Sequence, residues 1–386
     1  MIRSQAATAD RSAAHSSQGG LSTEADPLIQ TAMKHLGLSQ VEDCSWKMIA
    51  RGGSGREFYR VRPAGSGQNR PGKSGSESAP SVIAMRYSND REENAFYPDI
   101  ASFLRNIRVN VPRILFHDAA RRFIILDDLG DQSLFHAFQN VSDVDQVESL
   151  YRSSLDQIRI LHRHSACPAR TMSGFDEKLY RWERHYFLEN LASKWAGMKL
   201  SPSELEAVEA EGEQMAAELA SAPVCLVHRD FQSQNLLVHE DRIWLIDFQG
   251  MRPGHAAYDL ASLLYDPYVQ LGASRRGALL DWYQEQSLSD RAAAGTVGRS
   301  AGNGFMRQFY CAAVQRLMQA LGAYAFLGLV RGKSEFLSFI PRGLKNLADA
   351  LESLGGVKRT AELVRKIRSV KDVKPADPIR KRPVES

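Results

Sequence analysis

The sequence predicts an α+β fold with two lobes: a small N-lobe built on an antiparallel β-sheet and a larger, mainly helical C-lobe. Three observations support this. Strand patterns dominate residues 45–127, helical patterns dominate from Asp143 onward, and 43% of the 386 residues are hydrophobic, which is enough to form a core in each lobe. The pattern changes near Gly130, so we expect an N-lobe of residues 27–130 and a C-lobe of residues 131–360.

In the predicted N-lobe, short apolar or alternating runs are bounded by Gly and Pro, which is typical of strands. Residues 63–81 differ, because they are dense in Gly, Ser and Pro. We expect a flexible surface insertion there, since a strand pattern resumes directly after it. The predicted elements are a helix (27–37), two strands around a glycine-rich turn (45–61), a strand (82–87), a helix (92–107) and two strands (111–118 and 121–130).

In the predicted C-lobe, apolar residues recur every three to four positions, which is the spacing of amphipathic helices. The predicted helices cover residues 144–164, 175–195 and 201–220 and resume at Tyr258, while short strands lie at 225–227 and 236–246. Two ends lie outside both lobes. Residues 1–26 are rich in Ser, Ala and Gly and predict a disordered tail, and residues 361–386 predict a solvated basic tail.

Charge and hydropathy exclude several classes of protein. The net charge is only +4, without the concentrated basic face of a nucleic-acid binder, so we expect no nucleic-acid partner. No apolar run reaches the roughly 18 residues of a membrane span, and the N-terminus has no hydrophobic secretion signal. The four cysteines are far apart and form no CxxC pair, as is typical of reduced thiols. We therefore expect a cytoplasmic protein without a membrane partner, and no feature predicts its oligomeric state.

The strongest functional pattern is LVHRDFQSQNLLVHEDRIWLIDFQ, residues 226–249. An apolar segment ends in His228-Arg229-Asp230, Asn235 follows five positions after Asp230, and a later apolar run ends at Asp247. This is the spacing of a kinase catalytic loop. The HRD triplet alone is a weak signal, but its combination with the later Asn and Asp, each near the end of an apolar strand, rarely arises by chance.

Phosphoryl transfer needs an aligned nucleophile and neutralised phosphate charge more than it needs covalent help from the protein. Asp230 is the predicted catalytic base, because its carboxylate is placed to accept the hydrogen bond of a substrate hydroxyl. The Asn235 carbonyl oxygen and the Asp247 carboxylate are hard oxygen donors, and we predict that they bind Mg²⁺ on ATP. His228 is predicted to brace the loop.

Nucleotide-binding groups are predicted in the N-lobe. The backbone N–H groups of the glycine-rich turn are candidates to cover the phosphates, although a plain hairpin turn has a similar composition. Arg86 takes the place where kinases usually carry a phosphate-binding lysine, and it keeps the charge but not the compact geometry. Backbone groups in the segment that joins the lobes are candidates to bind adenine. The predicted residues are Gly53, Ser54, Gly55, Arg86, Asp127, Asp128 and Leu129.

At these residues the chain resembles the aminoglycoside phosphotransferase and choline kinase superfamily, which shares the protein-kinase-like fold. Asp247-Phe248 is followed by Gln249 and not by Gly, and the downstream pattern YDLASLL is similar to that of small-molecule kinases. No A-P-E element and no long activation segment lies between Asp247 and Tyr258, which argues against a protein substrate. The resemblance implies that Asp259 braces the C-lobe.

A narrower resemblance extends over roughly residues 30–355. The segments GSGREFYRV, RILFHDAARRFIILDDLGDQSL, VQRLMQALGAYAFL and FIPRGL are similar to bacterial kinases of N-acetylmuramate and N-acetylglucosamine. The resemblance implies an ATP- and Mg²⁺-dependent kinase that phosphorylates the anomeric hydroxyl of such a small molecule in cell-wall sugar recycling. Glu183 is then a candidate ligand of ring hydroxyls, and Arg316 of a substrate carboxylate such as the lactyl group of muramate. An internal salt bridge explains Arg316 equally well.

Three alternatives stay open. An aminoglycoside phosphotransferase would need acidic residues clustered near the base, because its substrate is a polycation. A choline or amino-alcohol kinase would need an aromatic cage, for which Trp182, Trp282 and Tyr283 are candidates. A catalytically silent, kinase-like binding module would be expected to lack one of the three catalytic-loop residues, and all three are present.

Overall fold

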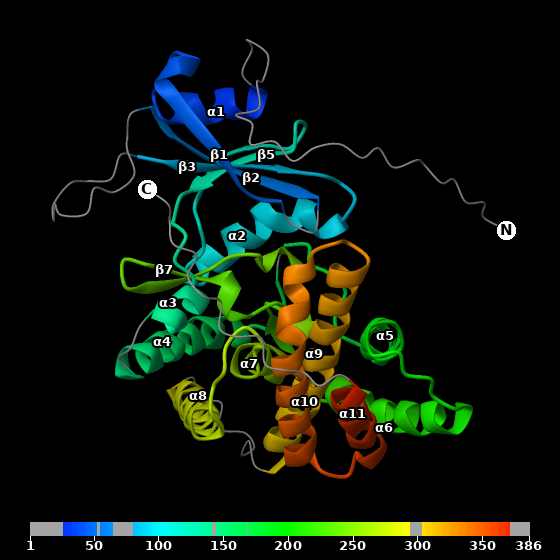
Figure 1. Cartoon of the computed structure of the whole chain (residues 1–386). Helices are drawn as coiled ribbons and strands as arrows, with labels where there is room; N and C mark the ends of the chain where they lie inside the picture. The colour runs from blue at the N-terminus through cyan, green and yellow to red at the C-terminus, as the bar shows by residue number, and fades with distance from the viewer. Residues whose placement is uncertain are drawn as a thin grey trace, which may run out of the picture. The chain divides into compact units, whose positions relative to one another are not determined.

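The computed structural model describes residues 26–51, 55–64, 80–140, 144–167, 169–293 and 303–370. These residues form two compact units (Figure 1). The first contains the described residues up to Tyr87 together with Leu115–Leu126, and the second contains Ser88–Ile114 together with the described residues from Asp127 onward. The expected N-terminal tail up to residue 25 and most of the expected insertion, residues 65–79, lie outside the described residues.

The first unit is built on a five-stranded sheet with the strand order β1-β2-β3-β5-β4. The strands are β1 (Cys44–Arg51), β2 (Arg56–Pro63), β3 (Val82–Tyr87), β4 (Ile114–Asp118) and β5 (Phe123–Asp127). β2 pairs in antiparallel fashion with both β1 and β3. Helix α1 (Pro27–His35) contacts β2 and β3, and its apolar face joins the buried cluster that includes Val61, Ala84 and Ile125.

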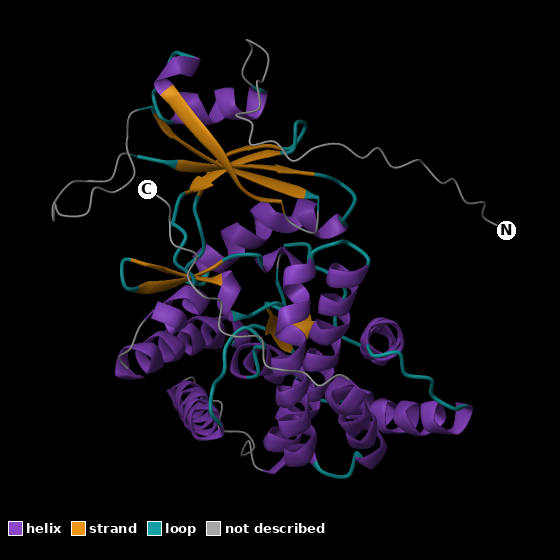
Figure 2. Cartoon of the chain, viewed as in Figure 1, coloured by secondary structure: helices purple, strands orange, loops and turns teal. Residues whose placement is uncertain are grey.

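The second unit is mainly helical (Figure 2). Its described residues also form two short strand pairs. β6 (Cys225–Val227) pairs with β9 (Arg252–Gly254), and β7 (Leu236–His239) pairs with β8 (Arg242–Leu245). The helices are α2 (Tyr97–Asn106), α3 (Leu134–Asn140), α4 (Val144–His162), α5 (Glu177–Phe187), the π-helical segment Leu188–Trp195, α6 (Pro202–Ala220), α7 (Ala257–Leu264), α8 (Ala273–Ala293), α9 (Asn303–Leu329), α10 (Ile340–Leu354) and α11 (Lys358–Val370).

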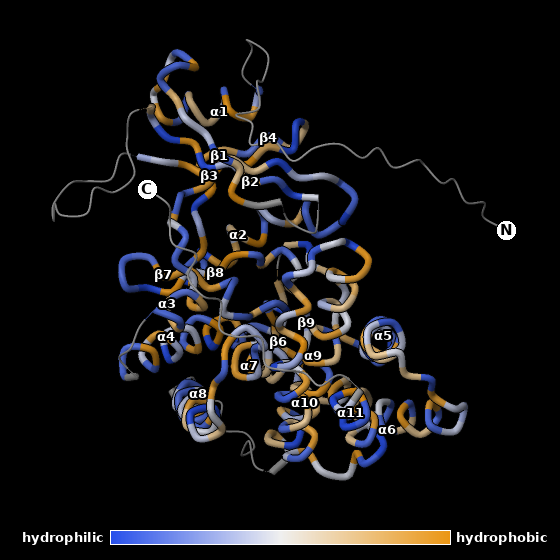
Figure 3. The backbone as a smooth tube through the Cα atoms, in the orientation of Figure 1, coloured by the Kyte–Doolittle hydropathy of each residue, from blue (hydrophilic) through white to orange (hydrophobic). Residues whose placement is uncertain are grey.

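Helices α7 and α9 form the centre of the second unit. Every residue of α7 is buried, and most of its length is hydrophobic in Figure 3. α9 contacts α5, α7 and α10, so it is surrounded by other helices on several sides. A helix that is apolar nearly all round is stable only in such an interior position. The centre of the unit therefore consists of the helix that follows the predicted catalytic loop and a helix from much later in the chain.

The expected α+β fold class is confirmed, and two details differ from the expected layout. The helix predicted at 92–107 belongs to the second unit, because the ring of Tyr97 packs against that of Phe248 with 4.6 Å between the ring centroids. Helical structure also continues past the expected end at residue 360. In α11 the apolar face Leu363, Val364 and Ile367 is buried, so the first part of the expected basic tail is a packed helix.

Candidate active site

The catalytic-loop pattern folds into a compact turn followed by a hairpin. The buried strand β6 ends at Val227, and the loop runs through His228 and Asp230 before β7 and β8 bring the chain back to Asp247. The Asn235 side-chain amide donates to the backbone oxygen of Asp230 at 2.9 Å, and the Asn235 backbone oxygen accepts from the amide of Ile246 at 3.0 Å. These two bonds place Asn235 beside both Asp230 and the residue that precedes Asp247.

Exposure separates the predicted reactive residues from the residues that hold them. The side chain of Asp230 is 32% exposed, and Asn235 and Asp247 are half-buried. His228 and Asp259 are buried, at 1% and 0% exposure. The structure therefore presents the three predicted reactive groups at a surface of the second unit and supports them from its interior.

Asp259, at the start of α7, holds the beginning of the loop. Its two carboxylate oxygens accept from the backbone amides of His228 and Arg229, at 2.7 Å and 2.8 Å. His162 lies 3.1 Å from the same carboxylate, and its other ring nitrogen lies 2.7 Å from the Tyr283 hydroxyl. Bonds from backbone amides to a buried carboxylate are charge-assisted and strong.

His228 links the loop to the strand that carries Asp247. Its Nε2 atom lies 3.1 Å from the backbone oxygen of Ile246, so this nitrogen is the one that carries the proton. The ring also packs edge-on against Phe231. The predicted bracing by His228 and Asp259 would act through these contacts, and His228 is only 1% exposed.

Asp247 adopts a left-handed backbone conformation, with φ 63° and ψ 32°. Such a conformation is strained for a residue with a Cβ atom, and strained residues cluster at functional sites. The Gln249 side-chain amide donates to Oδ1 of Asp247 at 2.8 Å. Protein kinases have Gly at the position of Gln249, and Gly has no side chain that could form this bond. In this chain Gln249 orients the carboxylate of Asp247. Its role was not predicted from the sequence.

The sequence also did not predict that Asp266 supports the loop that follows Asp230. The backbone amide and the hydroxyl of Ser233 both donate to Oδ2 of Asp266, at 2.7 Å and 2.6 Å, and the amide of Tyr268 donates to Oδ1 at 2.9 Å. Asp266 is 1% exposed, and burial raises the pKa of its carboxyl group. In the sequence, only its position after the apolar run LASLLY marks it as unusual.

Glu183 lies inside the second unit, at 1% exposure. Its oxygens accept from the Tyr258 hydroxyl at 2.8 Å and from the Gln315 side-chain amide at 3.2 Å. Burial raises the pKa of Glu183, and Arg229 is among the groups that oppose this rise. Glu183 lies in α5, within the helix predicted at 175–195, and its carboxylate is bonded to other residues of the unit, whereas the resemblance implied a direct substrate ligand.

Arg316, on α9, lies beside the predicted base. Its Nη2 atom is 3.6 Å from Oδ1 of Asp230 and 3.3 Å from Oε1 of Gln232. Nε donates to the Ser262 hydroxyl at 3.0 Å, and Nη1 donates to Gln319. The sequence left open whether Arg316 binds a substrate carboxylate or forms an internal salt bridge, and the structure shows the internal contact.

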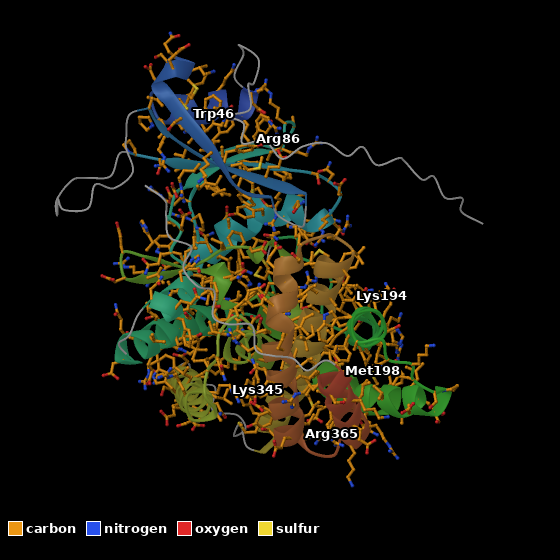
Figure 4. All side chains as sticks on the ribbon, viewed as in Figure 1. Trp46, Arg86, Lys194, Met198, Lys345 and Arg365 are labelled. Carbon is orange, nitrogen blue, oxygen red and sulfur yellow. The ribbon has the colours of Figure 1, made fainter. Side chains whose placement is uncertain are left out.

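Two of the predicted phosphate-binding residues, Gly55 and Arg86, are described and belong to the first unit. Gly53 and Ser54 lie outside the described residues, whereas Gly55 is described, with φ +72° in the turn before β2. Arg86 lies on β3 (Figure 4), and its guanidinium pairs with Asp26 at 2.5 Å and with Glu57 at 3.8 Å. Asp26 also accepts from the amide of Leu28 at the start of α1, so Arg86 has a structural contact within its own unit.

In the predicted adenine-binding segment, hydrogen bonds limit the available groups. The Asp127 carboxylate accepts from the guanidinium of Arg113 at 2.7 Å and 3.0 Å, and the Asp127 amide donates to the Arg113 backbone oxygen at 3.1 Å. The Asp128 side chain accepts from the amide of Gly130 at 3.0 Å, and Leu129 is buried at 6% exposure. The amide of Asp127 is therefore already used.

Among the described residues, no helix is both long enough and apolar enough to cross a membrane.

Comparison with known proteins identifies relatives along most of the chain. A model of the phosphotransferase enzyme family matches residues 53–295. The protein named N-acetylmuramate/N-acetylglucosamine kinase from Pseudomonas aeruginosa is 25% identical over 74% of this chain and 81% of its own length. The protein of the same name from Neisseria meningitidis serogroup B is 27% identical over 69% of this chain and 78% of its own length.

Solved structures with the same fold are more distant in sequence. The choline kinase from Cryptosporidium parvum Iowa II has a TM-score of 0.56 and 13% identity, and the alignment covers 89% of this chain and 98% of that one. The ADP-bound aminoglycoside phosphotransferase APH(2'')-Ib has a TM-score of 0.53 and 14% identity, with 87% and 98% covered. At this level of identity the likeness shows the fold alone.

The family model covers more than half of the chain, and the matched region contains the whole catalytic loop with Asp230, Asn235 and Asp247. This chain therefore belongs to the phosphotransferase enzyme family.

Proposed function

We propose that the protein is an ATP- and Mg²⁺-dependent kinase that phosphorylates the anomeric hydroxyl of N-acetylmuramate or N-acetylglucosamine, and that it acts in the cytoplasm in cell-wall sugar recycling. The observation that carries the proposal is the catalytic loop. In this loop Asn235 is hydrogen-bonded both to Asp230 and to Ile246, the residue that precedes Asp247. Curated relatives named for both sugars support the choice of acceptor.

The proposed base is Asp230. Its partly exposed carboxylate accepts the hydrogen bond of the acceptor hydroxyl and aligns that oxygen for direct in-line transfer. No covalent phospho-enzyme is required. The bonds from Asp259 to the loop backbone fix the position from which Asp230 acts, since a misplaced base loses the alignment on which the rate depends.

The residues present fit a magnesium ion. The Asn235 side-chain nitrogen is already bonded to the Asp230 backbone, so its oxygen is the atom left to act as a ligand. Oδ1 of Asp247 accepts from Gln249, and this bond orients the other carboxylate oxygen. Mg²⁺ prefers such hard oxygen ligands, and when bound it neutralises charge on the nucleotide phosphates.

We further propose that residues 27–130 supply the nucleotide-binding lobe and residues 131–360 the catalytic and substrate-binding lobe. In this proposal the backbone of the turn around Gly53, Ser54 and Gly55 covers the phosphates, and Arg86 adds positive charge nearby. The adenine would bind to backbone groups of the segment Asp127 to Leu129, in which the amide of Asp127 already donates to the backbone oxygen of Arg113.

An assay of ATP consumption tests the proposal. The acceptors are N-acetylmuramate, N-acetylglucosamine, glucosamine, choline and kanamycin, and the matched blank is Asp230→Asn, which should lower kcat by about 10²- to 10⁴-fold. We expect turnover on an N-acetylated hexosamine and acid-labile phosphate in the product, as a glycosyl phosphate requires. Turnover on choline or kanamycin alone would retain the kinase and refute the sugar. No turnover and no binding of Mg-ATP would favour a silent binding module.

A further inference from the structure

Arg316 is the buried cation that touches the proposed base. Arg316 is 6% exposed. Nε donates to Ser262, Nη1 donates to Gln319, and Nη2 donates to Gln232. Nη2 faces Asp230 Oδ1 at 3.6 Å and Gln232 Oε1 at 3.3 Å. The Asp230 contact is longer than a hydrogen bond but short enough for electrostatic attraction between the two charges.

The guanidinium keeps its charge in this interior position. Burial alone would lower the pKa of Arg316, but negative charge on neighbours such as Asp230 outweighs it and leaves the pKa raised. Each of the three nitrogens already donates to a protein acceptor, and the residue is only 6% exposed, so little of the guanidinium is open to a substrate carboxylate. The enclosed position of Arg316 therefore favours a role in orienting Asp230 over direct binding of a substrate carboxylate.

Two supports of the loop originate on the same buried helix. On α7, Asp259 bonds the backbone at the start of the loop, and Ser262, three residues later, bonds Nε of Arg316. Residues three apart on a helix lie on one face, so both supports are presented to the same side. Helix α7 thus fixes the loop backbone directly through Asp259. It fixes the side chains of Asp230 and Gln232 indirectly, through the bond between Ser262 and Arg316.

We propose that Arg316 is a positioning residue for phosphoryl transfer: it holds the carboxylate of Asp230 and the side chain of Gln232 in the orientation that accepts the substrate hydroxyl. The proposal rests on the proposed role of Asp230 as the base. It also assigns part of the reaction to α9, which lies after the region matched by the family model, residues 53–295. Arginine suits this task because its rigid fork reaches several acceptors at once, which a lysine cannot do.

The test compares Arg316→Met and Arg316→Lys with the wild type, using both N-acetylmuramate and N-acetylglucosamine. We expect Arg316→Met to lower kcat about 100-fold on both sugars while the KM for ATP is unchanged, because a small displacement of the base costs this much. Arg316→Lys should recover part of the loss. The matched control is Arg307→Met, on the same helix as Arg316. It removes an exposed ion pair with Glu218 of α6 and should leave kcat unchanged.

Two results would overturn the proposal: an unchanged kcat in Arg316→Met, or a loss confined to the KM of N-acetylmuramate, which would identify Arg316 as a ligand of the substrate acid. If Arg316→Met does not fold, Gln232→Ala removes the contact from the partly exposed loop side and should lower kcat in the same direction. An unchanged kcat there would equally refute the proposal.

A structural readout separates this inference from the choice of substrate. If the wild type phosphorylates neither sugar, the proposed function fails, and a crystal structure of Arg316→Met or Gln232→Ala still decides about positioning. We expect the Asp230 side chain to leave its wild-type orientation in these variants and to keep it in Arg307→Met. An unmoved Asp230 carboxylate would refute the inference.

Discussion

The carboxylate of Asp259 accepts a hydrogen bond from the backbone amide of Arg229 at 2.8 Å, and Arg229 has a φ of +79°. A positive φ is strained for a residue with a Cβ atom, so it persists only where the surroundings fix it. Asp259 supplies that constraint directly before Asp230. Its other oxygen accepts from the amide of His228 at 2.7 Å, so a single buried carboxylate fixes the turn into the catalytic loop.

Replacing Asp259 should therefore reduce both stability and turnover. Asp259→Ala leaves two buried amides without their acceptor, and we expect the free energy of unfolding to fall by about 3 kcal/mol. We also expect kcat to fall, because the loop relaxes away from its strained conformation. Thermal denaturation and an acceptor assay measure the two effects.

The matched control for this change is Asp290→Ala. Asp290 forms ion pairs with Arg159 and Arg163 near the surface, so its loss should cost less than about 1 kcal/mol and leave kcat unchanged. A melting temperature and kcat of Asp259→Ala equal to those of the wild type would show that the loop holds its shape without this carboxylate.

Removal of a proposed metal ligand should change the dependence on Mg²⁺. Asp247→Ala deletes the only charged ligand of the proposed pair, and we expect kcat to fall about 100-fold or more at every Mg²⁺ concentration. Asn235→Ala removes a neutral ligand, so the Mg²⁺ concentration for half-maximal rate should rise while turnover persists. Rates across a Mg²⁺ titration distinguish the two variants.

The control for the metal prediction lies in the same hairpin. Asp241→Asn removes an acidic side chain from the exposed turn between β7 and β8 and keeps a residue that tolerates its positive φ of 57°. The reaction rate of Asp241→Asn should depend on the Mg²⁺ concentration as the rate of the wild type does. If Asp247→Ala behaves like Asp241→Asn, Asp247 is not a metal ligand.

Local signals in the sequence predicted much of the fold. The helix predicted at 201–220 is α6, because Ser201 caps its first turn in a reciprocal bond with Glu204 and Pro202 fits the first helical position. The predicted base and one predicted metal ligand were identified for a similar reason: Asp230 and Asn235 are separated by five positions, and their hydrogen bond forms within one loop.

Contacts between distant parts of the chain were not predicted. Arg316 and Gln232 are 84 positions apart, and helical periodicity alone does not tell which neighbour a buried polar residue will meet. The resemblance to sugar kinases made Glu183 a candidate ligand, and no local pattern indicated that its carboxylate faces Tyr258 inside the unit. The short strand β9 has only three residues, too few for an alternating pattern, and it exists through its pairing with β6.

As the pH falls, protonation linked to His255 should lower the free energy of unfolding at a higher pH than the protonation of most carboxylates does. Burial, and then the nearby His162, lower the pKa of His255 from 6.5 to about 4. The unfolded chain therefore binds a proton on this residue more readily than the folded chain does, so its contribution to stability is complete above pH 6.5 and is lost as the pH falls toward 4. Between pH 7.5 and 5.5 this loss is about 1 kcal/mol.

Unfolding at several pH values measures this effect. His255→Gln should flatten the pH dependence of stability in this range, whereas His35→Gln, a change at an exposed histidine of α1, should not. An equal slope in wild type and His255→Gln would mean that the buried imidazole does not resist protonation.

Two glycines within helices should respond in opposite ways to the same substitution. Gly212, in α6, lies against Arg184, which is fully buried and pairs with Glu209 and Glu213. A Cβ atom at Gly212 would lie 2.5 Å from three side-chain atoms of Arg184, and the two ion pairs prevent that side chain from moving aside. We expect Gly212→Ala to lower the free energy of unfolding by about 1–3 kcal/mol, as overpacking does.

Gly277, in α8, provides the matched comparison, because a Cβ atom there has nothing within 4 Å. Alanine has the higher helix propensity, so Gly277→Ala should raise the free energy of unfolding by about 0.5–1 kcal/mol. Thermal denaturation of both variants beside the wild type tests the pair. If Gly212→Ala were also stabilising, helix propensity would outweigh packing there, and the Arg184 side chain would have to shift within the interior to make room for the methyl group.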